Sequence, residues 1–151
     1  MDLQSYNELF FQRLVESKDS QLSGIAKKSI KEINYHLRHS SKWVLRLGDG
    51  TVESHTKAQV AINDLWMFTD ELFQMNQHEI EIAKQKIGVY GPELKSKWYN
   101  TINKIVKQAN LCLPKNEHMQ SGGRSGIHTE YLGHMLSDMQ YLQRSYPDAK
   151  W

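Results

Sequence analysis

The sequence predicts an all-α protein, a helical bundle without a sheet. Apolar residues recur at steps of three and four along most of the chain, which is the spacing of one face of an α-helix. The 151 residues include only three prolines and nine glycines, while Leu, Ile, Lys, Glu and Gln, which favour helices, are abundant. The length and a hydrophobic fraction of 39% fit one globular domain over residues 1–151.

Five helices are expected, and turn residues bound the first two. The first covers about residues 2–17, and the side chain of Asp19 or Ser20 can cap the second. The second continues to Leu47, where the Gly-Asp-Gly run at 48–50 predicts a left-handed stop.

The other three helices are bounded mainly by proline, which suits a first turn but cannot continue a helix. Their expected bounds are about 52–75, from Gly91-Pro92 to just before Pro114, and from His128 or Thr129 to just before Pro147.

Apolar seams on these helices predict the bundle core. The seam of the second helix comprises Leu22, Ala26, Ile30, Ile33, Leu37, Val44 and Leu47. The third helix places Ile62, Leu65, Phe68 and Leu72 for burial, and the fifth has a seam of Leu132, Met135, Met139, Leu142 and Tyr146.

Two further stripes follow the second helix outside its seam. A basic stripe of Lys28, Lys31, Arg38 and Lys42 surrounds Tyr35, and a mixed stripe comprises Glu32, His36, His39, Trp43 and Arg46. The mixed stripe is too aromatic for a solvated face and too polar for a core, so we expect it to meet another helix or chain.

Composition excludes several classes of protein. A net charge of +2 is far from the strongly basic balance of a nucleic-acid binder. No apolar run reaches the length of about 20 residues that crosses a bilayer, and the first residues do not resemble a signal peptide. The sole cysteine, Cys112, can close no internal disulfide. We therefore expect a cytoplasmic protein that binds neither membrane nor nucleic acid.

Two Glu/His pairs are the candidate metal ligands. Di-iron carboxylate bundles use Glu-x-x-His on two helices and a Glu on each of two others, and no histidine here has a Glu three residues before it. Glu32 with His36, and Glu130 with His134, are one step wider but still share a helix face. These pairs could reach a metal, or they could form a buried polar network or an interhelical salt bridge.

A glycine-rich loop, Ser121-Gly-Gly-Arg-Ser-Gly126, precedes the fifth helix. Its N–H groups and the helix dipole favour an anion, and Arg124 adds a guanidinium, so a phosphate of coenzyme A would fit. The loop is also consistent with a flexible connection. It lacks the nucleotide-hydrolysing P-loop pattern, and the chain has no G-x-S-x-G elbow.

Several segments together resemble the non-catalytic structural subunit of the bacterial phenylacetyl-CoA epoxidase complex, in its C-terminal part. They are Lys31-Glu32, Tyr35-His-Leu-Arg38, Arg46-Leu-Gly, Gly126, His128-Thr-Glu130, Leu132-Gly133 and Met139-Gln-Tyr-Leu-Gln-Arg144. The resemblance implies a ferritin-like helical bundle that lacks the family's N-terminal helices, with a degenerate metal site. The absence of Glu-x-x-His agrees with that implication.

The resemblance also implies a function, namely scaffolding a separate di-iron catalytic subunit that epoxidises the aromatic ring of phenylacetyl-CoA in phenylacetate catabolism. No cofactor is then expected in this chain, and di-iron, an FAD/iron–sulfur reductase and NADPH belong to partner subunits. Lys31 and Arg124 are the candidate contacts to CoA phosphates or to a partner, and a homo-oligomer is expected. The alternative is a small metal-binding ferritin-like oxidoreductase or iron-storage bundle that uses Glu32, His36, Glu130 and His134.

Overall fold

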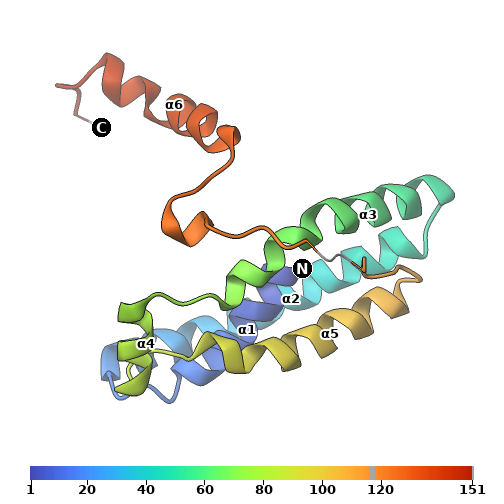
Figure 1. Ribbon diagram of the computed structural model, residues 1–151, viewed down its shortest axis with the longest axis horizontal. Coiled ribbons are helices and arrows are strands. Elements are labelled where there is room, and N and C mark those ends of the chain that lie inside the picture. Colours follow the sequence, from blue (N-terminus) through green and yellow to red (C-terminus); the bar gives the residue numbers. More distant parts are fainter. Residues whose placement is uncertain (116–117, 151) are drawn as a thin grey trace. The chain divides into compact units, whose positions relative to one another are not determined.

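The computed structural model describes residues 1–115 and 118–150 of the chain (Figure 1). The described residues form six α-helices and three 3-10 helices with no strand among them, which confirms the all-α prediction. The chain divides into two compact units, Met1–Gln120 and Ser121–Trp151, which are described in turn. The expectation of one domain over 1–151 stays a prediction.

The first unit contains most of the helices. They are α1 (Asp2–Leu14), α2 (Ser20–Gly48), α3 (Val52–Leu65), the 3-10 helix η1 (Trp66–Phe73), α4 (Gln77–Lys84), the 3-10 helix η2 (Gly91–Leu94) and α5 (Lys95–Gln108). Helices α1 and α3 both pack against α2, and α5 packs against α1 and α2, so that these four lie side by side (Figure 1).

The second unit contains one short and one long helix, η3 (Gly123–Ser125) and α6 (Glu130–Ser145). Thr129 is the N-cap residue of α6, as expected for a start near His128 or Thr129. The apolar seam predicted for this helix exists, but four of its members, Met135, Met139, Leu142 and Tyr146, are more than half exposed.

Helix α2 begins where the sequence predicts. The Oδ1 atom of Asp19 accepts hydrogen bonds from the N–H groups of Gln21 at 2.8 Å and Leu22 at 3.0 Å. These bonds satisfy two N–H groups that lack a partner inside the helix. One helix of 29 residues follows, with the inward-facing Ala26 fully buried.

The predicted left-handed stop at residues 48–50 is wrong. Neither glycine has a positive φ, and Asp49, the C-cap residue, has a φ of −97°. Gly48 is instead required by packing, because a Cβ at this position would lie 2.1 Å from the carbonyl oxygen of Ala109. The backbones of α2 and the end of α5 therefore approach more closely than any side chain would allow.

The predicted third helix, 52–75, is also wrong in its second half. The α-helix ends at Leu65 and continues as the 3-10 helix η1. The residues that pack inward along this stretch are Trp66, Thr69 and Phe73, which continue from Ile62 at steps of four and three residues. As a consequence, Leu65 and Phe68, which were expected to be buried, are 59% and 40% exposed.

Helix α4 was not predicted at all, although its signal is present. Asn76 accepts a hydrogen bond from the N–H of Glu79, and the Glu79 side chain accepts one from the N–H of Asn76. This reciprocal arrangement is a capping box, readable as Asn-x-x-Glu in the sequence.

The core is centred on α5. Its inner side presents Trp98, Ile102 and Val106 at four-residue steps, and none of them is more than 2% exposed. The Trp98 ring stacks on Trp66 at 5.6 Å between centroids and meets the edge of Phe73 at 5.3 Å. Residues of α1, α2 and α3 pack around this cluster.

The close approach at Gly48 generates a prediction that has a matched control on the same helix. A Cβ at Gly24 would meet nothing within 4 Å, whereas one at Gly48 would overlap Ala109. We expect Gly48→Ala to lower the free energy of unfolding by about 1–3 kcal/mol through overpacking. Gly24→Ala should raise it by about 0.5–1 kcal/mol, because alanine loses less backbone entropy in a helix. Urea denaturation measures both; equal effects of the two substitutions would contradict this account of the α2–α5 contact.

Candidate functional site

The side of α2 that faces away from the core carries a row of charged and aromatic side chains that contact one another. The basic stripe and the mixed stripe predicted for this helix lie next to each other and interact. We call this surface the α2 outer face; it comprises Lys28, Lys31, Glu32, Tyr35, Arg38, His39, Lys42, Trp43 and Arg46, all of them exposed.

Three rings follow one another along the α2 outer face. Tyr35 stacks on His39, with 5.9 Å between ring centroids and 23° between planes, and His39 meets the edge of Trp43. The indole Nε1–H of Trp43 donates a hydrogen bond of 3.1 Å to Nε2 of His39. Because Nε2 accepts this bond, the hydrogen-bonded imidazole is the neutral tautomer that carries its proton on Nδ1.

A guanidinium group covers each end of this row of rings. The Arg38 guanidinium lies 5.9 Å from the centroid of Tyr35, and that of Arg46 lies 5.6 Å from Trp43. Exposed cation–π contacts of this kind contribute about 0.5–1 kcal/mol each. They hold the rings and charges of the face in a defined arrangement.

The first candidate metal pair lies on the same helix. Oε1 of Glu32 is 3.5 Å from Nε2 of His36, and the two side chains are 73% and 50% exposed. The expectation of a buried network or an interhelical salt bridge is therefore wrong for this pair, which is an exposed contact within one helix. Lys31 lies beside it on the α2 outer face.

The second candidate metal pair belongs to the other unit. Glu130 and His134 lie on the exposed first turns of α6. Over residues 1–115 and 118–150, no group of three or more His, Cys, Asp or Glu side chains is placed to hold a metal ion. Within each unit, each pair thus offers two of the ligands that a metal site needs.

The glycine-rich loop is folded on itself. Gly122 and Gly126 have φ angles of 103° and 87°, which place them in the left-handed region on either side of η3. The N–H groups of Ser125 and Ile127 donate to the carbonyl oxygen of Gly122 at 2.8 and 2.9 Å. Because these N–H groups already have partners, the predicted cradle of N–H groups for an anion is weakened, and Arg124 is the remaining part of that prediction.

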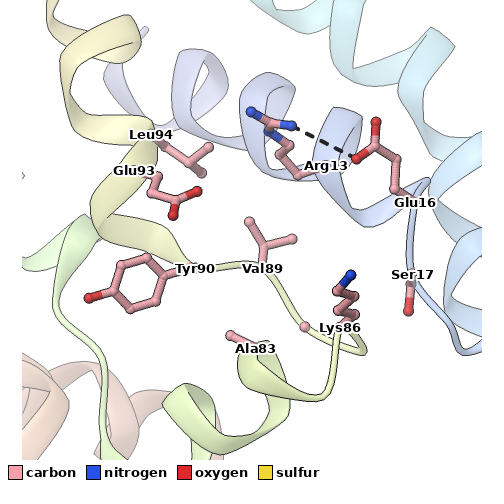
Figure 2. Close-up of a pocket in the computed structure, with 10 residues that line it drawn as sticks. Arg13, Glu16, Ser17, Ala83, Lys86, Val89, Tyr90, Glu93 and Leu94 are labelled. Atoms are coloured by element: carbon pink, nitrogen blue, oxygen red, sulfur yellow. Dashed lines mark ion pairs between the residues drawn. The ribbon is translucent and has the colours of Figure 1, made fainter.

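A cavity that sequence reasoning missed lies where α1 ends (Figure 2). It measures about 360 Å³ and is lined in part by Tyr90, Glu93 and Leu94. Arg13 and Glu16 form an ion pair of 3.8 Å at its rim, and Lys86, with a φ of 61°, lies on the opposite side. The cavity forms because the turn after α4 is pinned to the end of α1, where the Lys18 N–H donates to the Lys86 carbonyl oxygen at 2.9 Å. No local pattern in the sequence signals this long-range contact.

The fold defines a class of protein, an all-α helical bundle, and one of its helices carries a row of charged and aromatic side chains on its outer face. None of the described helices combines the length and apolarity that crossing a membrane requires. The family model for "phenylacetic acid catabolic protein" matches residues 3–151, and the chain belongs to this family.

One curated relative extends this result. The chain is 42% identical over 149 residues to one of the subunits of the 1,2-phenylacetyl-CoA epoxidase of Escherichia coli (strain K12). The alignment covers 99% of this chain and 60% of the relative, so the chain spans about three fifths of the length of the curated protein it matches.

The exposure of Glu32 and His36 predicts a small role in stability. Exposed i, i+4 pairs contribute about 0.3–0.5 kcal/mol, so Glu32→Gln and His36→Gln should each lower the free energy of unfolding by no more than that. Ile102→Ala, at a fully buried position, should by contrast lower it by about 2–5 kcal/mol. Chemical denaturation measures the free energy of unfolding of the three variants. A decrease of more than about 1 kcal/mol for Glu32→Gln would contradict this prediction and show that the pair stabilises the fold as much as a buried interaction does.

Proposed function

We propose that this chain is part of a non-catalytic scaffold subunit of a multicomponent oxygenase that epoxidises the aromatic ring of phenylacetyl-CoA in phenylacetate catabolism. Membership of the phenylacetic acid catabolic family carries the proposal, and the name of the E. coli relative supports it. The exposed rings and cations of the α2 outer face support a role in contacting other subunits, since Trp, Tyr and Arg are enriched at interface hot spots.

In this proposal the redox chemistry belongs to partner subunits. A di-iron centre in the catalytic subunit activates O2, and a reductase with FAD and an iron–sulfur cluster supplies electrons from NADPH. The chain's own Glu/His pairs do not fit a di-iron centre, because each pair lies on a single exposed helix face and the described residues add no third ligand to either. The complex acts in the cytoplasm, a setting that the single cysteine favours.

Lys31 and Arg124 are the proposed contacts to partner carboxylates or to the phosphates of the CoA group. Both side chains end in cations that donate charge-assisted hydrogen bonds. Such a bond contributes about 1.5–3 kcal/mol when desolvated at an interface and much less when it remains in water.

Co-expression with the di-iron catalytic subunit of the same organism tests the proposal. We expect the two chains to co-purify, and we expect elemental analysis to assign iron to the catalytic subunit. Stoichiometric iron in this chain alone would instead favour the metal-binding or iron-storage alternative. A Glu32→Ala chain that folds normally but abolishes turnover of the reconstituted complex would contradict the scaffold role.

The two proposed contacts predict a salt-dependent loss of association. Lys31→Ala with Arg124→Ala should weaken binding of the catalytic subunit by about tenfold or more at low salt, and by less at high salt, because exposed charges are screened. Lys97→Ala, an exposed position on α5, is the matched control and should leave the affinity unchanged. Calorimetric titration at two salt concentrations measures the effect; equal losses in the double variant and the control would exclude these residues as contacts.

A homo-oligomer is the second part of the proposal. The seam of α2 packs against its neighbours within the first unit, whereas the seam of α6 leaves Met135, Met139 and Leu142 exposed at 51%, 70% and 53%. An amphipathic helix with such a stripe is stabilised by burying it. We expect light scattering at micromolar concentration to show a dimer or larger species, and Met139→Lys to reduce its mass. A monomer in the unmodified chain would contradict this part.

A further inference from the structure

Positive charge is concentrated on α2. This helix carries six Lys and Arg residues and one Glu, a net of five positive charges, although the whole chain has a net charge of only +2. All other residues together therefore carry a net charge of −3. The net charge of the whole chain conceals this concentration of positive charge, which becomes evident only when the charges of α2 are counted separately.

The cations of the α2 outer face have no carboxylate partners among the residues that the structure describes. Ion pairs elsewhere join Arg13 to Glu16, Lys57 to Glu53 and Lys95 to Asp70. The two arginines of the face contact aromatic rings instead. Unmatched cations in a row create a positive potential that favours an acidic partner.

The same face exposes apolar surface in a fixed arrangement. Tyr35 and Trp43 are 50% and 48% exposed, and His39 connects them through stacking and a hydrogen bond. Rings held in this way lose little further side-chain entropy when a partner covers them, which favours binding. From Lys28 to Arg46 the face extends about 27 Å along the helix axis.

We propose that the α2 outer face is a docking surface for an acidic amphipathic helix of a different polypeptide. The carboxylates of the partner helix would meet Arg38, Lys42 and Arg46, and the apolar stripe of that helix would cover Tyr35 and Trp43. Cations at Arg38, Lys42 and Arg46 recur once per helical turn, which matches the spacing of carboxylates on a helix that lies along α2. The proposal does not depend on the oxygenase assignment.

Charge argues against a second copy of this chain as the occupant. Helices α1, α3, α4 and α6 each have a net charge of only −1, and η1 has −2. Helix α5 has four lysines and no acidic residue, so it would be repelled. None of these described helices can neutralise five positive charges, whereas an acidic helix from another protein can.

Three synthetic helical peptides of about 18 residues, long enough to follow the face, test the proposal. The first has Glu residues beside a Leu stripe, the second has Lys in place of Glu, and the third has the composition of the first in scrambled order. Fluorescence anisotropy of each labelled peptide should show that the first binds at least about tenfold more tightly than the others. Its affinity should fall with added salt.

Paired variants locate the binding surface. Arg38→Gln with Arg46→Gln removes two charges from the face, and Tyr35→Ala with Trp43→Ala removes two of its rings. Each pair of substitutions should lower the affinity for the first peptide by about tenfold or more. Lys97→Gln with Lys107→Gln removes the same charge from α5 and should change nothing. Arg38→Lys with Arg46→Lys keeps the charge but lacks the planar guanidinium groups, and we expect an intermediate affinity. This variant controls for a loss of binding that is caused by misfolding.

Several results would overturn the proposal. Equal binding of the scrambled peptide would show charge attraction alone, and equal losses in the α5 control would show that the surface is not specific. A dimer that the α2 variants dissociate would identify a second copy as the occupant. Failure of the oxygenase partner to bind this chain is compatible with positive peptide results, so failure of the proposed function and failure of this inference remain distinguishable.

Discussion

The close contact between α2 and α5 at Gly48 and Ala109 is the constraint on which the arrangement of the first unit depends. Because no side chain separates the two backbones here, α5 can place Ile102 and Val106 against the inner side of α2 and its neighbours. These residues are almost fully buried. The inner half of α2 is thereby committed to the core, and the opposite half must face outward.

The outward half of α2 is consequently where the chain can act on other molecules. A helix of 29 residues that is supported along one side stays regular without partners for its other side. Rings and cations on that side are fixed by contacts with one another, such as the hydrogen bond from Trp43 to His39. The core and the α2 outer face are two consequences of the same helix packing.

Local signals in the sequence predicted what depends on local interactions. The cap at Asp19 follows from side-chain hydrogen bonding, and the start of α6 after Thr129 follows from the residue preferences of helix ends. The end of α2 was predicted to within one residue, at Leu47 against Gly48. The close approach of Gly48 to Ala109 and the change to a 3-10 helix at Trp66 could not be predicted, because neither has a local signal in the sequence. The capping box of α4 is visible in the sequence, but this eight-residue helix was not predicted because it is too short to show a long apolar period.

The candidate site divides in the same way. Spacing predicted which residues share a face, so the stripes of α2 and the pairs Glu32/His36 and Glu130/His134 are where they were expected along their helices. Spacing says nothing about what lies opposite a face. Whether a Glu/His pair becomes a metal site depends on ligands from other helices, and whether a loop binds an anion depends on N–H groups that are not already bonded. The Gly122 carbonyl oxygen accepts hydrogen bonds from two N–H groups of this loop, and these bonds become evident only in the folded chain.

Net charge illustrates why a charged surface is hard to recognise from composition. A value of +2 excludes a strongly basic protein, yet it is the sum of +5 on one helix and −3 elsewhere. Short-range electrostatics acts over about a Debye length, roughly 8 Å at physiological salt, so a partner that covers α2 experiences the local charge and not the sum. The cations of the α2 outer face keep it solvated while it is free, and they make its association dependent on a partner that carries the complementary charge. A surface of this kind selects its partner by electrostatics and stabilises the contact through Tyr35 and Trp43.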